Sequence, residues 1–561
     1  MKNQRRNDEG MALLLATFFV AIAIMTLGAV MVGVVGESRQ VTFFENYEEC
    51  MYGVESMLAM SIASIEAGNG GLIGVTPGSG FDLLAADPFA QPGVSPIQED
   101  NIMPGLEGFA FVVDWHNDGT DNNGDGSTDG LDELWYYTIY AYARQGGTTR
   151  RVEVVVQGQD VNVWRNAIFA GFGAAGNLIN GNVAIHGSVH LLGDGVPAGG
   201  LVMTAIDMGG KSLIHNNYLG LETKPELLER VPAIPTDTFN GEEVSTLEAV
   251  LRVRKGLVGL SGDSEIGSPD VSGNLFKETL DATFVTDGWA GNSTTDDGGR
   301  GIPTKVYSDN GYNETYDLGD RVPMPYLDDV WRTPGTGATV PDPVRGGAYT
   351  HANYFSEVLV GAPGNPTDGP FESLTINTGT SYYRNANGDP NPANRQPVDG
   401  QDYIYYDAAT KEMEIHGHLH INGDLSFKGQ GGDTTISYTG KGAILVTGNA
   451  TVDVNLLTIN ADGTAAQSFP ANCLGIMTRG NLTVGSTAQL KLMGAFYAQG
   501  MVRSSKQTTT MGTLVGNYFD MGTNVPDIYQ VPTLADNLPD GMIGNYPIMF
   551  LDIESWRELG I

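Results

Sequence analysis

The sequence predicts a mainly β protein with one long N-terminal α-helix, a smaller α+β part that includes this helix, and a β-helix or solenoid head with an irregular insertion. Three observations lead to this fold class. Residues 11–36 carry no charged side chain, 76 of the 561 residues are glycine, and a short motif that begins with glycine recurs in the last two thirds of the chain. Abundant glycine beside a high apolar content is typical of a turn-rich β protein.

The overall charge and the cysteine count exclude several classes of protein. The chain has 30 Lys and Arg against 66 Asp and Glu, which gives a formal net charge of -36. So negative a chain repels phosphate, so nucleic acid is not an expected partner. Two cysteines, Cys50 and Cys473, cannot form a disulfide framework or a four-cysteine zinc site, and we expect both thiols to be unpaired.

The N-terminal helix is predicted to cross a membrane. The 26 residues from 11 to 36 would form a helix of roughly 39 Å, which is long enough to span a bilayer. Lys2, Arg5 and Arg6 precede the segment, and no Lys or Arg occurs between Gln40 and Ala143. The positive-inside rule therefore places the N-terminus in the cytoplasm and the rest of the chain on the exported side.

Apolar residues at helical spacing continue beyond the uncharged segment and end before a glycine-rich stretch at residues 68–71. They predict an amphipathic second half, so that one helix would cover residues 11–67. The apolar positions of this stripe are Val41, Phe44, Tyr47, Met51, Val54, Leu58, Ile62 and Ile65.

A short charged leader that ends in Gly10, followed by an apolar helix with an amphipathic continuation, resembles a type IV prepilin, in particular the PilX-type minor pilins. This resemblance implies a pilin-like α+β stalk stored in the inner membrane. It also implies cleavage between Gly10 and Met11 by prepilin peptidase, N-methylation of the new terminus, and assembly with other pilins or pseudopilins. Leu15 stands where most major pilins have a glutamate, which favours a minor or tip role. An ordinary signal anchor outside any filament is the alternative.

A calcium site is predicted in the lysine-free and arginine-free stretch. Side chains with oxygen atoms, or a backbone carbonyl at Ser127, occupy the ligand positions of a twelve-residue calcium loop, with Gly126 at the sharp turn. The aspartate at the last position makes the loop resemble a dockerin repeat. Its flanks, residues 108–114 and 135–143, read as strands, and a solvated turn without an ion is the alternative. The predicted ligands are Asp121, Asn123, Asp125, Ser127, Asp129 and Asp132.

Short strands are predicted wherever a glycine, a small or polar residue, and an alternating apolar pair recur. Such units bury a continuous core only when they stack, which indicates a β-helix. We expect solenoid segments at residues 161–200 and 414–530 around an insertion at 201–413, which carries a helical pattern over 221–258. Residues 1–10 would be the leader, 68–160 the β region with the calcium loop, and 531–561 a C-terminal segment. The motif begins at Gly181, Gly187, Gly417, Gly423, Gly448 and Gly480.

Five histidines lie on these repeats, and strand alternation places them opposite the apolar residues. Stacked rungs could bring them together as a transition-metal site or as a patch that gains charge near pH 6.5. An exposed polar face without a ligand is the simpler interpretation. The residues are His186, His190, His416, His418 and His420.

No catalytic motif was found in the sequence, so the chain is not expected to be an enzyme. The function that the residues favour is a minor pilin or pseudopilin-like subunit. It would be stored in the membrane, incorporated sparsely or at the tip of a type IV pilus or related filament, and would display a large head to a surface or a glycan. A membrane-anchored structural solenoid and an anchored carbohydrate-active protein are the alternatives.

Overall fold

The structure is a computed structural model of the 561-residue chain. It describes residues 2–66, 70–76, 81–82, 87–98, 105–115, 120, 136–174, 179–194, 204–290, 294–297, 300–333, 338–360, 373–385, 402–431, 434–486, 488–504, 506–521, 526–545 and 549–559. The chain forms two compact units: Met1–Gln159 with Met549–Ile561, and Asp160–Ile548. The second unit is thus inserted in the chain before the last strand of the first.

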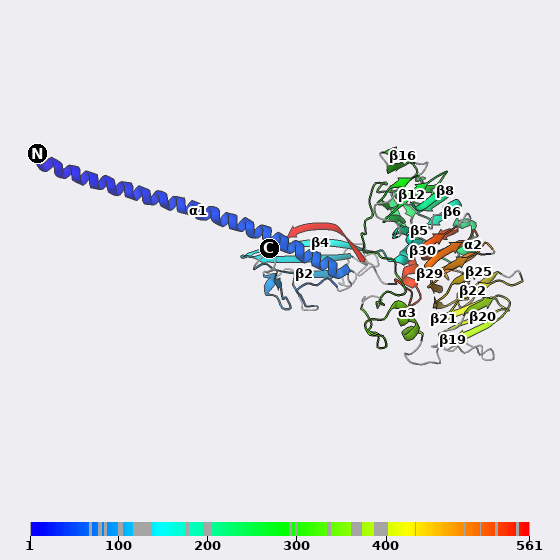
Figure 1. Ribbon diagram of the computed structural model, residues 1–561. Coiled ribbons are helices and arrows are strands. Elements are labelled where there is room, and N and C mark those ends of the chain that lie inside the picture. The colour runs from blue at the N-terminus through cyan, green and yellow to red at the C-terminus, as the bar shows by residue number, and fades with distance from the viewer. Residues whose placement is uncertain are drawn as a thin grey trace. The chain divides into compact units, whose positions relative to one another are not determined.

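The first unit consists of the long helix and an antiparallel sheet (Figure 1). The strands follow the order β1-β2-β3-β4-β32, so the C-terminal strand lies at the sheet edge beside β4. The hairpin of β3 and β4 is tightly in register, with Ile139 opposite Val154. The elements are α1 (Lys2–Glu66), η1 (Pro88–Ala90), β1 (Ile97–Gln98), β2 (Glu107–Asp114), β3 (Tyr136–Gln145), β4 (Thr148–Asp160) and β32 (Met549–Leu559).

One face of the second half of α1 packs on this sheet. Val54, Met57 and Ile65 are buried there together with Ala110 of β2 and Ile139 of β3. The predicted amphipathic stripe is therefore confirmed in its later part. Its first two positions, Val41 and Phe44, are exposed because the helix has not yet reached the sheet core.

A glycine lets the helix approach the sheet closely. A Cβ atom at Gly53 would lie 2.8 Å from the Cβ of Ala143 and 2.9 Å from Cδ1 of Leu106. Carbon atoms do not approach so closely without a shift of backbone or side chain. Gly53 is therefore a packing position of the helix, although glycine normally costs about 1 kcal/mol in a helix interior.

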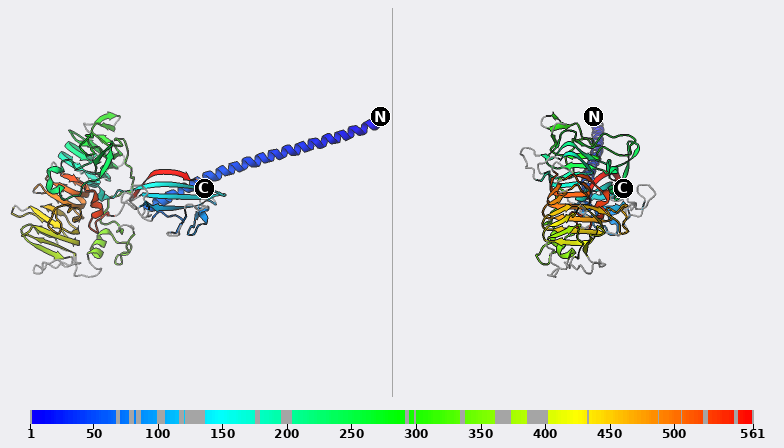
Figure 2. Two further views of the ribbon diagram at one scale, coloured as in Figure 1. Left: turned by 180° about the vertical axis from the view of Figure 1, so that it is seen from behind. Right: turned by 90° about the vertical axis from the view of Figure 1, so that its right-hand side faces the viewer.

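The second unit is a parallel β-helix, whose stacked strands are visible in Figure 2. One side consists of β21, β24, β27, β29, β30, β5, β7, β11 and β14, each pairing with the next in parallel. A second side runs through β23, β26, β29, β30, β31, β6, β8 and β13. A third runs through β18, β22, β25, β28, β29 and β30.

The strands of this unit are β5 (Ile168–Ala174), β6 (Ile179–His186), β7 (Val189–Leu191), β8 (Thr204–His215), β9 (Thr236–Phe239), β10 (Glu242–Ser245), β11 (Val250–Val253), β12 (Leu257–Leu260), β13 (Glu265–Ile266), β14 (Ala282–Val285), β15 (Trp289–Ala290), β16 (Thr294–Asp297), β17 (Arg300–Pro303), β18 (Leu374–Asn377), β19 (Tyr382–Asn385), β20 (Tyr403–Asp407), β21 (Glu412–Ile421), β22 (Leu425–Lys428), β23 (Thr435–Thr439), β24 (Lys441–Val446), β25 (Ala450–Asp453), β26 (Asn455–Thr458), β27 (Cys473–Thr478), β28 (Leu482–Val484), β29 (Lys491–Ser504), β30 (Thr509–Asp520) and β31 (Asp527–Tyr529). Its short helices are η4 (Val163–Arg165), η5 (Leu221–Thr223), α2 (Pro225–Leu228), α3 (His351–Tyr354), the π-helix η6 (Phe355–Leu359) and η7 (Pro532–Asn537).

The spatial order of the rungs differs from their order in the chain. The first strand of the unit, β5, pairs with β30 near the end of the unit, for example Phe169 with Val515. From β5 the chain builds rungs outward to β14, and from β21 it builds rungs inward to β30. The two halves therefore meet at a seam in the middle of the β-helix, formed by β5 and β6 on one side and β30 and β31 on the other.

The recurring sequence motif forms one corner of the β-helix. Its glycines stack, and the Gly480 amide donates to the Gly448 carbonyl at 2.9 Å. The polar residue that follows accepts from the next rung: Asp424 Oδ1 from the Asn449 amide at 2.7 Å, and Asn449 Oδ1 from the Asn481 amide at 2.9 Å. At this corner the glycine amide is thus paired with a backbone carbonyl of the neighbouring rung, and the amide of the next residue with a side-chain oxygen of that rung.

Two sequence predictions differ from the structure. Residues 201–413 are not simply an insertion, because β8, β11 and β14 in this range continue the parallel ladder. The helix expected from the pattern over 221–258 is present only as the single turns η5 and α2. Residues 250–253 and 257–260 are strands, so the prediction was wrong there. The apolar residues in this range have helical spacing, but the segment forms strands because they pair with neighbouring rungs. Leu251, for example, pairs with Val189 and Thr283.

Candidate functional site

The first half of α1 exposes apolar side chains over its whole circumference. Every residue from 16 to 35 is exposed, including Phe18, Ile24 and Val32. The helix is long and apolar enough to cross a membrane, with a mean hydropathy of 2.6 over its most apolar window, none of which is buried. Gly10 and Met11 lie within α1, and the first fifteen side chains are outside the described part of the chain.

Side-chain contacts fix α1 to the sheet near the residue at which the helix extends beyond the sheet. The Arg150 guanidinium of β4 lies 3.4 Å from the ring centroid of Tyr47 on α1, and Arg150 also forms an ion pair with Glu558 of β32. The Tyr47 hydroxyl donates to Glu558 at 3.2 Å. This triad joins the helix, the central hairpin and the C-terminal strand, so the last strand helps to orient the helix.

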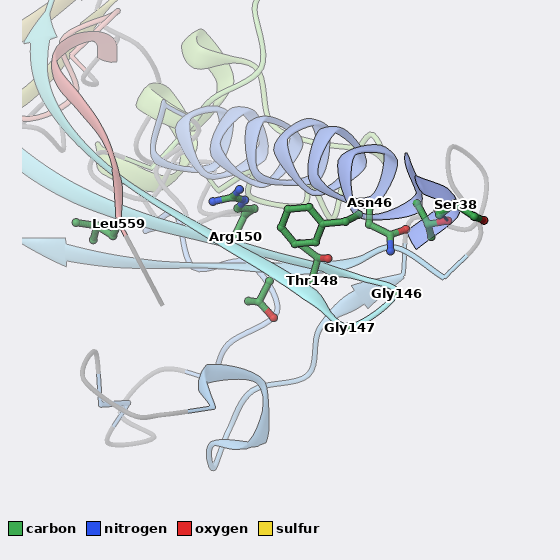
Figure 3. A pocket seen from close by; sticks show the side chains of 10 residues that line it. Ser38, Asn46, Gly146, Gly147, Thr148, Arg150 and Leu559 are labelled. Atoms are coloured by element: carbon green, nitrogen blue, oxygen red, sulfur yellow. Dashed lines mark hydrogen bonds between the residues drawn. The ribbon is translucent and has the colours of Figure 1, made fainter. Parts of the chain in front are cut away.

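A groove beside this triad lies between the helix and the tip of the β3–β4 hairpin. It has a volume of about 690 Å³. Figure 3 shows Ser38 and Asn46 on the helix and Gly146, Gly147 and Thr148 on the hairpin around it. The groove follows directly on the apolar half of α1, and Phe43 and Leu559 line it together with these polar groups.

Both cysteines are free and buried. Burial raises the pKa of the Cys50 thiol, and it raises the pKa of Cys473 to about 12. The Cys50 thiol donates to the Thr148 carbonyl at 3.2 Å. The expected unpaired thiols are confirmed, and neither has the lowered pKa of a reactive cysteine.

The histidines of the first repeats are buried and do not lie on an exposed face, which corrects the expectation for them. His186 and His190 are each 1% exposed. The His186 ring stacks between those of His215 at 4.6 Å and Tyr529 at 4.1 Å, across the seam of the two halves. Alternation had placed these imidazoles outside, but residues 185–192 are all buried because rungs and loops cover both faces.

The histidines of β21 point away from the core, as alternation predicts. Leu419, between His418 and His420, is buried, and so is Ile421 after His420. His418 Nδ1 lies 3.5 Å from Asp402 Oδ2, and burial lowers the pKa of His420 to about 4. β21 does not pair with β6 or β7, so the two histidine groups are not brought together. Among the described residues, no group of three His, Cys, Asp or Glu could hold a metal ion.

The predicted calcium ligands, Asp121, Asn123, Asp125, Ser127, Asp129 and Asp132, lie outside the described residues. The structure does describe strands on both sides of the loop. Asp114 at the end of β2 pairs with Tyr137 at the start of β3. Any ion held by the loop would therefore close a long hairpin between neighbouring antiparallel strands.

A cavity in the second unit was not predicted from the sequence. It has a volume of about 280 Å³ and is lined by Trp331, His351 and Tyr354 among others. These residues follow no repeat and come from separate loops and turns. The only local signal was a cluster of aromatic residues between Tyr326 and Phe355.

Comparison with known proteins gives little further guidance. No model of a known protein family matches the sequence, and no curated protein matches it. Among solved structures, the chain is similar to the crystal structure of the competence-associated pilin ComZ from Thermus thermophilus, with 17% sequence identity and a TM-score of 0.47, over 92% of this chain and 97% of that chain. At this identity and TM-score, the similarity by itself assigns neither fold nor function.

Proposed function

We propose that the chain is a type IV pilin-like subunit, stored in the inner membrane with its N-terminus in the cytoplasm. Prepilin peptidase would trim it after Gly10, and it would join a pilus or related filament through its helix. The observation that carries this proposal is the division of α1. Its first half is apolar and exposed on all sides, and its second half continues without a break into a sheet-packed stalk.

The physical argument concerns the exposed apolar surface. Twenty consecutive exposed residues of this hydropathy are unstable in water and need either lipid or other apolar helices around them. If the helix moves from the lipid bilayer into the apolar core of a filament, its first half is surrounded by apolar groups in both places and needs no polar side chains. A rigid stalk at its end, held by the Arg150 and Glu558 pair, fixes the direction in which the helix leaves the sheet.

A minor or tip position is the finer part of the proposal. Leu15 replaces the glutamate of most major pilins, and the inserted unit Asp160–Ile548 is more than twice as long as the first unit. A head of this size on every subunit would crowd a close-packed filament. We therefore infer sparse or terminal incorporation, with the head displayed for adhesion to a surface or glycan.

The N-terminal peptide of the protein isolated from its native membrane tests the proposal. A trimmed protein begins with an N-methylated Met11, and mass spectrometry distinguishes this from a chain that retains residues 1–10. In a Gly10→Leu variant the leader should remain, whereas Gly28→Leu, in the same helix with no atom within 4 Å of the added Cβ, should be trimmed normally. Untrimmed wild-type protein would refute the processing step.

Contacts with other pilins would use the exposed side of the second half of α1. Phe43, Phe44 and Tyr52 are 53%, 63% and 60% exposed there. A Phe44→Glu change should reduce co-isolation with the filament without unfolding the stalk, because the Phe44 side chain is exposed and is not part of the buried core of the first unit. Unchanged incorporation of this variant would exclude this face as the contact.

Two alternatives predict different results. A membrane-anchored structural solenoid would keep Met1 and would not co-purify with filaments. A carbohydrate-active protein would convert polysaccharide substrates without any filament, and turnover assays with the full chain would detect it. We propose no catalytic role, and calcium remains the proposed ion of the loop at Asp121 to Asp132.

A further inference from the structure

The cavity of the second unit is built from three chain segments and the side of the β-helix. Residues 325–333, the turns α3 and η6, and residues 540–545 surround it, and His418 of β21 contributes one wall. The segments are anchored to the β-helix by buried hydrogen bonds. The Tyr497 hydroxyl donates to the Pro325 carbonyl at 2.7 Å, and the Trp164 indole N–H donates to the Ile543 carbonyl at 2.7 Å. The walls are therefore preorganised.

Aromatic rings form one side of the cavity. Trp331 and Tyr354 stack at 4.2 Å with an interplanar angle of 15°, and the His351 ring lies 5.0 Å from Trp331. Tyr354 is half-buried, while Trp331 and His351 are each 6% exposed. Rings held in this way offer apolar surface whose geometry does not change on binding.

The buried Trp331 indole has a polar atom without a partner. Its N–H forms no hydrogen bond within the described part of the chain. The His351 ring faces the backbone of Met542 and Gly541, whose hydrogen bonding favours its charged form, but burial dominates and lowers its pKa to about 3. Unpaired buried groups like the Trp331 N–H are rare in native proteins and call for an explanation such as a bound water, ion or ligand.

The remaining polar groups define the charge of the ligand. Asp329, Asp540 and Arg332 are among the residues that line the same cavity. Asp329 Oδ2 accepts from the Tyr326 amide at 2.7 Å, which fixes its position. Two carboxylates against one guanidinium disfavour an anionic ligand. Carboxylates need donors and the indole needs an acceptor, so the ligand must offer both from neighbouring atoms.

We propose that this cavity binds one ring of a neutral sugar. Each hydroxyl of a pyranose both donates and accepts, the C–H face of the ring is apolar and suits an aromatic wall, and a single ring fits a volume of about 280 Å³. The proposal names the ligand class of the head and rests on this cavity alone. It does not depend on whether α1 enters a filament.

Saturation-transfer NMR on the full chain in lipid nanodiscs tests the site. Nanodiscs are needed because common detergents carry sugar headgroups. The probes are the methyl glycosides of glucose, galactose, mannose, fucose and N-acetylglucosamine, with glucuronate and glucosamine as charged comparisons. We expect at least one neutral glycoside to bind more strongly than both charged sugars. No binding by any neutral glycoside, or a preference for a charged sugar, would overturn the proposal.

Two variants locate the binding. Trp331→Phe removes the unpaired N–H together with part of the indole ring, and should weaken binding by about fivefold to tenfold, the effect of losing one hydrogen bond. The smaller ring leaves a cavity, so its melting temperature without sugar should fall somewhat. Trp289→Phe is the matched control, since it loses the same ring volume at a buried position and its indole N–H donates to the Tyr312 carbonyl at 3.1 Å elsewhere in the β-helix. It should lower the melting temperature by more, because a hydrogen bond is lost too, and leave sugar binding unchanged.

Asp540→Asn provides a second measurement that does not touch the core, because Asp540 is exposed at the cavity. It should weaken binding of the same glycoside while the fold is kept. If neither Trp331→Phe nor Asp540→Asn weakens the binding that wild-type protein shows, the sugar binds elsewhere and the assignment is wrong. Loss of filament incorporation with intact sugar binding would instead refute only the proposed pilin role.

Discussion

The two units of this protein bury their cores in different ways. The first unit relies on one helix face, in which Val54, Met57 and Ile65 share a core with residues of β2, β3, β4 and β32. The second unit repeats a small rung many times, and each rung pairs only with its neighbours. A defect in the helix face should therefore affect the entire first unit, whereas the effect of a defect in the β-helix should depend on its distance from the seam.

The largest expected effect is at the seam. Phe169→Ala in β5 removes a fully buried ring that lies between β30 and β7, and should cost about 3–5 kcal/mol. Hydrogen exchange should show loss of protection in both halves of the β-helix. Phe427→Ala removes an equally buried ring from β22, beyond which β18 is the last strand of this side that the structure describes, so protection should be lost mainly there. If the two variants lost hydrogen-exchange protection over equally long parts of the β-helix, the seam would have no special role.

The second effect concerns pH and again concentrates at the seam. Burial lowers the pKa of His215 from 6.5 to about 4 and lowers that of His186 as well, with the Lys224–Asp527 ion pair nearby. Between these values the unfolded chain binds a proton that the folded chain excludes, so stability falls as pH falls from 6.5 to 4. For His215 the loss is about 3 kcal/mol.

Chemical denaturation of the second unit at pH 7 and pH 4 measures this effect. His215→Phe keeps an aromatic ring in the stack with His186 but cannot titrate, so the difference between the two pH values should shrink. The exposed His416→Phe is the control and should leave the difference unchanged. A pH dependence that His215→Phe does not alter would locate the titrating group elsewhere.

A third change breaks the helix face of the first unit. Gly53→Leu places its Cβ within 3 Å of Ala143 and Leu106, and overpacking of this kind costs about 1–3 kcal/mol. Hydrogen exchange in β2, β3 and β4 should rise together, since one helix covers all three. Gly33→Leu, which meets no atom within 4 Å, should have no such effect. Protection lost in only one strand would show that the sheet does not depend on the helix as a whole.

The smallest effect is expected from calcium in the first unit. If the loop between β2 and β3 binds calcium only when folded, the ion stabilises by about 1.4 kcal/mol at ten times its dissociation constant. A chelator should therefore lower the melting temperature of the first unit and leave that of the second unchanged. Asp125→Asn should remove most of this difference. Identical melting with and without chelator would mean that the loop holds no ion.

Regular local patterns in the sequence were sufficient to predict α1 and the corner motif of the β-helix. The apolar spacing from Tyr47 onward defines the buried helix face, and Gly448 with Asn449 forms a corner in which each residue serves the next rung. The strands beside the predicted calcium loop were also confirmed as β2 and β3. In each case the contacts that form the element involve residues within one or two helical turns, or one rung, of the residues that show the pattern.

Long-range pairing was not predictable in this way. Leu251 follows a helical pattern in the sequence but lies in a strand between Val189 and Thr283, more than thirty residues away in both directions. His186 alternates as an outward residue would, yet Tyr529 and His215 cover its ring. Such positions are decided by which rung stacks on which, and no local pattern encodes that order.

The sequence by itself determined the apolar helix, the polarity of its flanks, the strand alternation of the repeats and the negative charge of the chain that follows the helix, because these depend on composition and spacing. Only the tertiary structure decided that β5 stacks on β30, that β32 returns to the first sheet, and that Trp331 and His351 share a cavity with residues 540–545. These features depend on contacts between distant segments, and their free energy is gained only after the entropy of bringing those segments together has been overcome.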